Sequence, residues 1–274
     1  MATIELDETT IHYERSGQGP AMLFVHGMCG DADVWADQAA RFSDRFTCVR
    51  YDRRGHSRSG RGAGPISVAR HADDAAALIA ALELAPCLLV GSSSGAVIAV
   101  DVARRHGHLL HGAVLSEPPL FCLLPDHGRS FIDELSRQLE APMAVGGPAA
   151  AVDAFFSLVC PGLWSSIDEI AKDRYRANAE IGFTDLRSAP LEVTPAELAT
   201  ITIAVLVIGG DASHPALRAV AHRLTEALPD ARLVELADCG HVTYAEQPDD
   251  FSAAVSVFAA ELDRHTASTT AETP

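Results

Sequence analysis

The stretch CLLVGSSSG, residues 87–95, decides the fold. Its first four residues are a continuous apolar run, which is typical of a buried strand. The next five have the pattern Gly-x-Ser-x-Gly, and apolar residues at helical spacing follow over 95–105. A sharp strand-to-helix turn strains its central residue and requires small neighbours. We therefore predict that Ser93 points out of such a turn at a helix N-terminus, which favours developing negative charge.

Strands and helices alternate on both sides of this turn. Buried strands are predicted over 21–25, 46–51, 87–90, 113–115, 203–208 and 232–236. Helices are predicted over 33–42, 67–82, 95–105, 215–228 and 249–262. Continuous apolar strands separated by helices are typical of a parallel sheet that is covered on both faces. The predicted fold class is therefore α/β, with a doubly wound, mostly parallel sheet.

Residues 120–202 interrupt the alternation with helical patterns and no convincing strand. A large share of the few aromatic residues lies here: Phe121, Phe131, Phe155, Phe156, Trp164 and Tyr175. We predict a helical cap over the edge of the sheet, with Trp164 in its substrate pocket. The core domain is predicted to comprise 1–119 and 203–264, and the polar residues 265–274 to form a mobile tail.

Composition narrows the possible partners and compartments. A formal net charge of −16 leaves little to neutralise phosphates, so neither nucleic acid nor an anionic membrane is an expected partner. The six cysteines form no C-x-x-C pair, so we expect no metal site. We expect no secretory signal at the N-terminus, which lacks its pattern, and no membrane span, because no apolar run approaches the roughly 20 residues that one needs. These features favour a cytoplasmic protein.

A base for Ser93 must come from a loop at the same edge of the sheet. Among twelve histidines, His241 lies in the loop after the last predicted strand, in Asp238-Cys239-Gly240-His241. The carboxyl ends of parallel strands share one edge, so His241 is predicted to meet Ser93 there. His26 also follows a strand, but it precedes a glycine and is interpreted as a buried histidine that holds its loop.

Acyl transfer also needs N–H donors aimed at the oxygen that becomes negative. One predicted donor is the amide of Ser94, the residue after the nucleophile. The other should come from the loop after strand 21–25. The amide of Met28 is our choice, and that of Gly27 is the alternative.

The ordered motifs resemble the α/β-hydrolase superfamily. They are His26-Gly27, Asp52-Arg53-Arg54-Gly55-His56-Ser57, Gly91-x-Ser93-x-Gly95 and Gly240-His241, and the resemblance spans about residues 10 to 263. It implies a catalytic triad, no organic cofactor and no metal, and a cap inserted after the sixth strand that shapes the pocket. The segment 52–57 is similar to a turn of that family, with His56 in place of its second glycine, and is interpreted as structural.

The third triad member is where this chain departs from the family. Most relatives carry an Asp in a G-x-x-D turn, but here Gly210 is followed three residues later by Ser213, which has no charge. Glu117 directly follows strand 113–115 and should open into the same cleft. The Ser-Ser-Gly elbow and Glu117-Pro118-Pro119 resemble the zearalenone-type lactonases. Glu117 is therefore the predicted acid, and Asp211 the alternative.

The resemblance implies a serine hydrolase that cleaves a carboxylic ester or lactone of a small hydrophobic substrate through an acyl-enzyme. Carbon–carbon bond hydrolysis of a diketone by the same triad is the alternative, and a non-catalytic ligand-binding member is a third possibility. The sequence does not specify an oligomeric state.

Overall fold

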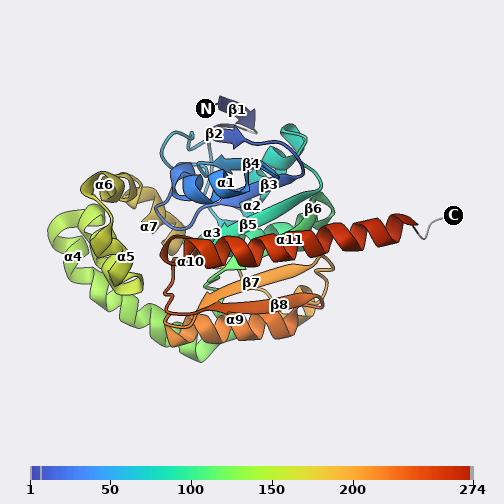
Figure 1. The fold of residues 1–274 in the computed structure, drawn as a ribbon. Helices are drawn as coiled ribbons and strands as arrows, with labels where there is room; N and C mark the ends of the chain where they lie inside the picture. Colours follow the sequence, from blue (N-terminus) through green and yellow to red (C-terminus); the bar gives the residue numbers. More distant parts are fainter. Residues whose placement is uncertain (1, 7, 272–274) are drawn as a thin grey trace.

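The computed structural model describes residues 2–6 and 8–271, in which eight strands form one sheet (Figure 1). The strands are β1 (Ala2–Leu6), β2 (Thr9–Ser16), β3 (Ala21–Val25), β4 (Thr47–Tyr51), β5 (Cys87–Ser92), β6 (Leu110–Ser116), β7 (Val205–Gly210) and β8 (Ala231–Leu236). Their order across the sheet is β1-β2-β4-β3-β5-β6-β7-β8. Strand β2 pairs antiparallel with β1 and β4, and every other neighbouring pair is parallel.

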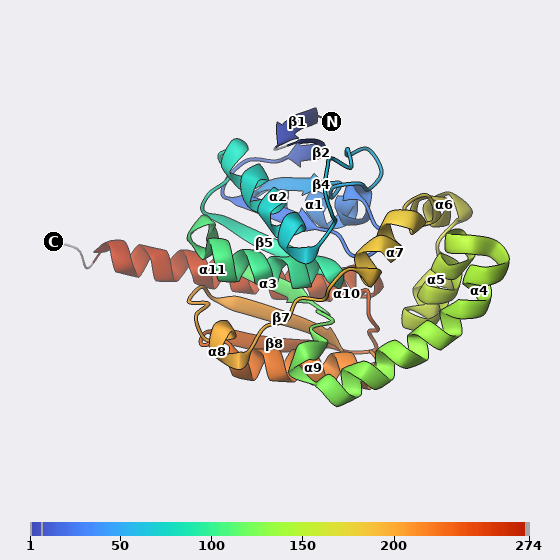
Figure 2. The same cartoon turned by 180° about the vertical axis from the view of Figure 1, so that it is seen from behind.

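Helices cover both faces of the sheet. They include α1 (Ala36–Phe42) after the short turn η1 (Ala32–Trp35), α2 (Val68–Ala81), α3 (Ser94–His106) before η2 (Gly107–Leu109), α9 (Pro215–Ala227), α10 (Thr243–Glu246) and α11 (Pro248–Ala271). Helices α1 and α11 lie over the face seen in Figure 1, and α2, α3 and α9 over the face seen in Figure 2. Alternate strand residues supply the two cores: Leu23 and Val25 face one, Met22 and Phe24 the other. The predicted doubly wound α/β fold is confirmed.

The sequence pattern does not predict β1 or β2. Most of β1 is exposed, and this strand pairs only with β2 at the edge of the sheet. A short edge strand needs no continuous apolar run, so it lacks the signal by which the central strands are recognised.

The predicted helical insertion lies between β6 and β7. It contains η3 (Phe121–Leu123), α4 (Pro125–Val159), α5 (Pro161–Ser166), α6 (Glu169–Ala177), α7 (Ala179–Arg187) and α8 (Pro195–Leu198). Helices α4 to α7 project from one end of the sheet as a separate arm (Figure 1), and α7 returns to the core beside α3 in Figure 2. We call α4 to α8 the cap.

Helix α4 contains a longer apolar stretch than inspection of the sequence predicts. Its part Gly128–Val159 is long and apolar enough to cross a membrane by length and composition only; an 18-residue stretch within it has a mean hydropathy of 1.4, and 22% of that stretch is buried. The charged residues at the start of this stretch hide it from inspection of the sequence. Gly147 has a non-helical conformation (φ 67°) with Pro148 directly after it, so the stretch is two segments joined at a kink.

Helix α11 is longer than predicted, because it continues to Ala271. The predicted tail therefore begins inside this helix. Residues 272–274 lie outside the described part of the chain.

Candidate active site

Ser93 lies in the turn between β5 and α3. Its backbone angles, φ 54° and ψ −125°, are strained for a residue with a side chain. The flanking glycines make the turn possible: a Cβ on Gly91 would lie 2.4 Å from the carbonyl oxygen of Gly95, and a Cβ on Gly95 would lie 2.3 Å from that of Val25. The Ser93 amide donates to the carbonyl of Ser116 on β6 at 2.8 Å, which ties the turn to the neighbouring strand.

Ser93, His241 and Glu117 form a hydrogen-bonded line. His241 Nε2 is 3.0 Å from Ser93 Oγ, and His241 Nδ1 is 3.2 Å from Glu117 Oε2. Both His241 and Glu117 are buried. A carboxylate on Nδ1 holds the proton there, which leaves Nε2 free to accept the serine proton. The structure thus brings together the three residues that the sequence predicts.

Glu117 is fully buried at the end of β6, where three groups donate to its carboxylate. Gly210 N donates to Oε1 at 2.9 Å, and Ser213 Oγ donates to Oε2 at 2.5 Å beside His241. Ser213 is the residue at the usual acid position of the resembled family. Here its hydroxyl donates a hydrogen bond to the predicted acid, Glu117, at the end of the neighbouring strand β6.

Asp211, the alternative acid, does not contact His241. It is exposed at the start of the loop after β7, and its Oδ1 accepts from the amide of Cys239 at 3.4 Å. Asp211 thus braces the loop that carries His241. Ser213, two residues further along the turn, is the residue that reaches the Glu117 carboxylate beside His241.

Glu246 is a residue of this site that sequence reasoning misses. Its carboxylate accepts from Gly240 N at 3.0 Å and from Val242 N at 2.8 Å, on either side of His241. These bonds fix the backbone that presents the imidazole. The sequence shows only a carboxylate five residues after the histidine. This spacing does not distinguish a residue that binds the backbone around His241 from an ordinary surface residue.

The predicted N–H donors stand free beside Ser93. Gly27 packs against the nucleophile, since a Cβ placed on it would be 3.2 Å from Ser93 Cβ. Within residues 2–6 and 8–271, the backbone amides of Met28 and Ser94 donate to no protein acceptor. Ser94 is the first residue of α3, so its amide is one of those that a helix leaves unpaired. Both amides are available to a substrate oxygen.

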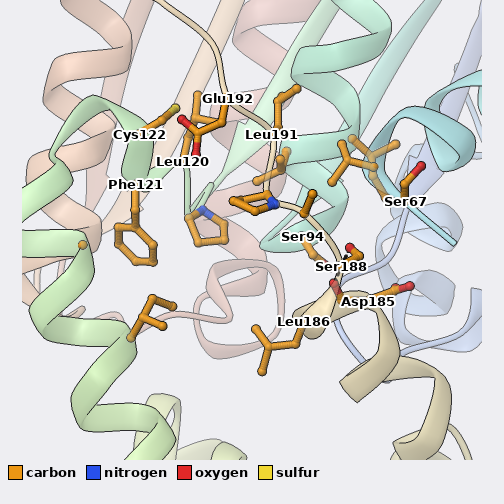
Figure 3. Close-up of a pocket in the computed structure, with 18 of the residues that line it drawn as sticks. Ser67, Ser94, Leu120, Phe121, Cys122, Asp185, Leu186, Ser188, Leu191 and Glu192 are labelled. Carbon is orange, nitrogen blue, oxygen red and sulfur yellow. Dashed lines mark hydrogen bonds between the residues drawn. The ribbon is translucent and has the colours of Figure 1, made fainter. Parts of the chain in front are cut away.

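Two cavities meet at Met28, in the loop beside the nucleophile. Ser93 and His241 line a small one of about 30 Å³, together with Phe155, Phe156 and Tyr175 of the cap. Met28 lines both this cavity and a larger one of about 600 Å³, shown in Figure 3. Apolar side chains dominate the larger chamber: Val97, Ile98, Leu120, Phe121, Ile132, Leu186 and Leu191. A bulky hydrophobic group has room there, next to the free amides.

A third and wider cavity, of about 1040 Å³, lies between α4 and α9. Its lining includes Ser213, Gly240 and Glu246, so it adjoins the triad from the side of the acid. Ser93 lines neither this cavity nor the chamber in Figure 3. The chamber is the better candidate substrate site because Met28 and Ser94, whose amides are the predicted oxyanion donors, line it.

Trp164 does not line either cavity beside Ser93, contrary to prediction. It is buried in α5, where its ring stacks on Phe156 at 4.8 Å between centroids and meets Tyr175 edge-on. These two neighbours line the small cavity, and Trp164 lies behind them. The apolar ring is used to fill the interior of the cap, which composition alone cannot distinguish from a pocket wall.

A buried charged cluster borders the larger chamber. Arg53 Nη1 is 3.0 Å from Asp185 Oδ2 of α7, and His71 Nε2 is 3.2 Å from Asp185 Oδ1. Burial would raise the pKa of Asp185, but the Arg53 charge and the His71 hydrogen bond lower it well below its usual range. Burial and the Arg53 charge lower the pKa of His71. The histidine is therefore neutral and the carboxylate ionised at neutral pH.

His26 holds its loop, as interpreted from the sequence. The amide of Arg53 donates to His26 Nε2 at 3.0 Å, so the proton is on Nδ1, which donates to the carbonyl of Gly27 at 2.9 Å.

In the described part of the chain, no group of three or more His, Cys, Asp or Glu side chains is arranged to hold a metal ion.

Comparison with known proteins shows similarity along most of the chain. A family model described as the alpha/beta hydrolase family matches residues 22–254. The 2-(acetamidomethylene)succinate hydrolase of Mesorhizobium japonicum is 26% identical over 271 residues, which cover 93% of each protein. The uncharacterized hydrolase YraK of Bacillus subtilis is 43% identical over 129 residues, and this match spans 46% of each protein.

Solved structures show the same architecture. The enol-lactonase from Burkholderia xenovorans LB400 superposes with a TM-score of 0.75 and 23% identity, covering 94% of this chain and all of that one. The meta-cleavage product hydrolase from Pseudomonas fluorescens IP01 superposes with a TM-score of 0.73 and 19% identity, covering 92% and 95%. Likeness at these identities establishes the fold.

Proposed function

We infer, from the premise that this chain belongs to the alpha/beta hydrolase family, that it cleaves an acyl substrate through Ser93, His241 and Glu117. One observation carries the proposal: the hydrogen-bonded line from Ser93 Oγ through the imidazole to a buried carboxylate. A serine is a weak nucleophile unless a base takes its proton, and an oriented imidazole is the usual base.

The geometry supports an acyl-enzyme mechanism. His241 Nε2 takes the proton of Ser93 Oγ as that oxygen bonds to the substrate carbonyl carbon. The amides of Ser94 and Met28 donate to the oxyanion, and the Glu117 carboxylate stabilises the imidazolium. Imidazolium then gives its proton to the leaving oxygen as the tetrahedral species collapses. A water molecule, activated by the same imidazole, hydrolyses the acyl-enzyme and releases Ser93.

The proposed substrate is a hydrophobic carboxylic ester or lactone. The apolar chamber next to the free amides supports a bulky group on the acyl or alcohol side. The position of Glu117 after β6 supports the likeness to zearalenone-type lactonases. No cofactor is needed for this chemistry.

The test is a substrate panel with a nucleophile variant. We expect the protein to hydrolyse aryl esters and bulky lactones, and to act more slowly on a vinylogous diketone. Ser93→Ala should lower kcat by several orders of magnitude with an unchanged melting temperature. Ser94→Ala is the matched control, because it retains the backbone amide and loses only a hydroxyl that has no partner among the described residues.

Two outcomes would contradict the proposal. Faster turnover of the diketone than of any ester would indicate a carbon–carbon hydrolase. Failure of a fluorophosphonate probe to label Ser93 in the folded protein would indicate a non-catalytic member.

A further inference from the structure

The loop of residues 26–30, here named the oxyanion loop, is held mainly from outside. Its own bonds are two donations to the carbonyl of Gly27, from Gly30 N at 3.3 Å and from His26 Nδ1 at 2.9 Å. Cys29 has a positive φ of 57°, which is strained for a residue with a side chain. A loop in this conformation must be stabilised by its surroundings, and helix α7 of the cap lies directly on it.

Asn178, just before α7, binds the far end of the oxyanion loop. Its Nδ2 donates to the carbonyls of Cys29 at 3.2 Å and of Gly30 at 3.0 Å. Its Oδ1 accepts from Ser57 N at 2.8 Å, so the amide cannot rotate without losing a partner. The side chain is buried and lines none of the three cavities described above. Asn178 can therefore act on a bound substrate only through the residues that it contacts, which are the oxyanion loop and Ser57.

Gly182 follows one turn later on the same face of α7. A Cβ placed on it would lie 2.2 Å from Cys29 Sγ and 3.2 Å from Cys29 N. The helix backbone thus rests on the strained residue of the loop, and any side chain at position 182 would push the two apart.

Asp185, about one turn further along, acts through Arg53. Its carboxylate binds Arg53 Nη1, and Arg53 Nη2 donates to the carbonyl of Gly27 at 3.1 Å. The carbonyl of Gly27 and the amide of Met28 belong to the same planar, trans peptide, so they point in opposite directions. Three donors on the Gly27 oxygen therefore aim the Met28 N–H. Figure 3 shows Asp185 and Leu186 at the end of α7 bordering the same chamber as Ser94.

We propose that α7, through Asn178, Gly182 and Asp185, positions the oxyanion loop for catalysis. These are positioning residues, since none of them is placed to touch the reacting atoms. This proposal rests on the proposed acyl-transfer function. It assigns to the cap a part in the chemical step as well as in the shape of the pocket.

Loosening a donor of the oxyanion hole should cost turnover more than binding, since that donor is needed most in the transition state. We expect Asn178→Ala and Gly182→Ala each to lower kcat on an aryl ester by about 10- to 100-fold, with KM within about threefold of wild type. A trifluoromethyl ketone, which forms a tetrahedral adduct with the serine, should bind each variant more weakly by a similar factor.

Asp185→Asn tests the link through Arg53. This variant should also have a lower kcat, a nearly unchanged KM and weaker binding of the ketone. Because Asp185 also lines the chamber, an increase in KM would indicate that it contacts the substrate directly. Glu180→Gln is the matched control: it makes the same exchange of carboxylate for amide on an exposed position of α7 and should leave kcat, KM and ketone affinity unchanged. Circular dichroism and melting curves establish that each variant is folded at the assay temperature.

The outcomes separate the two proposals. If wild type hydrolyses esters but folded variants raise KM while keeping kcat and ketone affinity, α7 shapes the pocket only and this inference is wrong. If Asn178→Ala fails to fold, Gly182→Ala, which removes no hydrogen-bonding or charged group, decides alone by the same criteria. If wild type shows no esterase activity and no labelling of Ser93, the proposed function fails and this inference falls with it.

Discussion

Glu117 has a backbone conformation that few residues other than glycine adopt, with φ 50°. Such strain persists where surrounding contacts hold it, and here the amide of Glu117 donates to the carbonyl of Ile208 at 2.9 Å. The side chain then meets donors from β7 and its loop together with His241. A carboxylate held this way can serve as the triad acid, although it follows β6 and Ser213 occupies the position after β7 where the resemblance leads us to expect an Asp.

Glu117 and Asp211 are the two carboxylates that contact His241 or its loop. Glu117→Gln should lower kcat by at least a few hundredfold, because an amide neither fixes the tautomer nor stabilises the imidazolium, and such losses reach about four orders of magnitude. Asp211→Asn, the matched control, should lower kcat by less than about tenfold, because it only braces the Cys239 amide. Steady-state kinetics on an aryl ester, with melting curves for both variants, provide the measurement. A severe loss of kcat in Asp211→Asn, together with a nearly unchanged kcat in Glu117→Gln, would mean that Asp211 and not Glu117 is the triad acid.

Among the elements, the insertion between β6 and β7 contains aromatic residues of two kinds: some line the chamber and others fill the interior of the cap. Phe121 of η3 lines the chamber, whereas Trp164 of α5 packs behind Phe156 and Tyr175. The two aromatic residues come from the same insertion and are both apolar. Truncating them should therefore have different consequences.

We expect Phe121→Ala to change the relative rates on bulky and small esters by about tenfold, with a modest loss of stability. Trp164→Ala should leave that ratio unchanged but cost about 3–5 kcal/mol of folding stability, or roughly 10 °C in melting temperature. Rates on an aryl acetate and on a bulky aryl ester, with melting curves, test both. A specificity change in Trp164→Ala with a normal melting temperature would restore its pocket role.

The central elements and the triad are predictable because their signals are local. Strand β5 is a continuous apolar run, and Ser93, His241 and Glu117 each directly follow or closely succeed a strand. The positions of Asn178 and Asp185 are not predictable in this way. Asp185 meets Arg53 across 132 residues of sequence, and nothing in the pattern of α7 indicates that its polar residues face the core instead of solvent.

At the scale of the whole molecule, three buried histidines surround one arginine. Burial lowers the pKa of His26, His56 and His71, and the charge of Arg53 lowers each of them further. Their side chains lie near one another, with ring centroids 4.9 Å apart for His26 and His56 and 6.1 Å for His56 and His71. The folded protein therefore keeps three neutral imidazoles that the unfolded chain would protonate near pH 6.5.

This arrangement sets the sign of a pH dependence. Below about pH 6.5 the unfolded chain binds more protons than the folded one, so the free energy of unfolding falls as pH falls towards the lowered pKa values. Each histidine changes the free energy of unfolding by at most about 1.4 kcal/mol per pH unit. Between pH 6.5 and 5, we therefore expect this free energy to fall with a slope that approaches two to three times that value. The stability that depends on neutral imidazoles is fully present above pH 6.5, and urea unfolding at several pH values measures its loss.

The histidine variant His71→Gln should make that slope shallower by about one proton, whatever it does to the stability at pH 7. His108→Gln is the matched control, because the His108 side chain is exposed in the folded protein. A slope that His71→Gln leaves unchanged would mean that His71 is protonated in the folded protein. Asp185 would then pair with two cations, Arg53 and protonated His71. The contact between α7 and the core would in that case become more stable as pH falls.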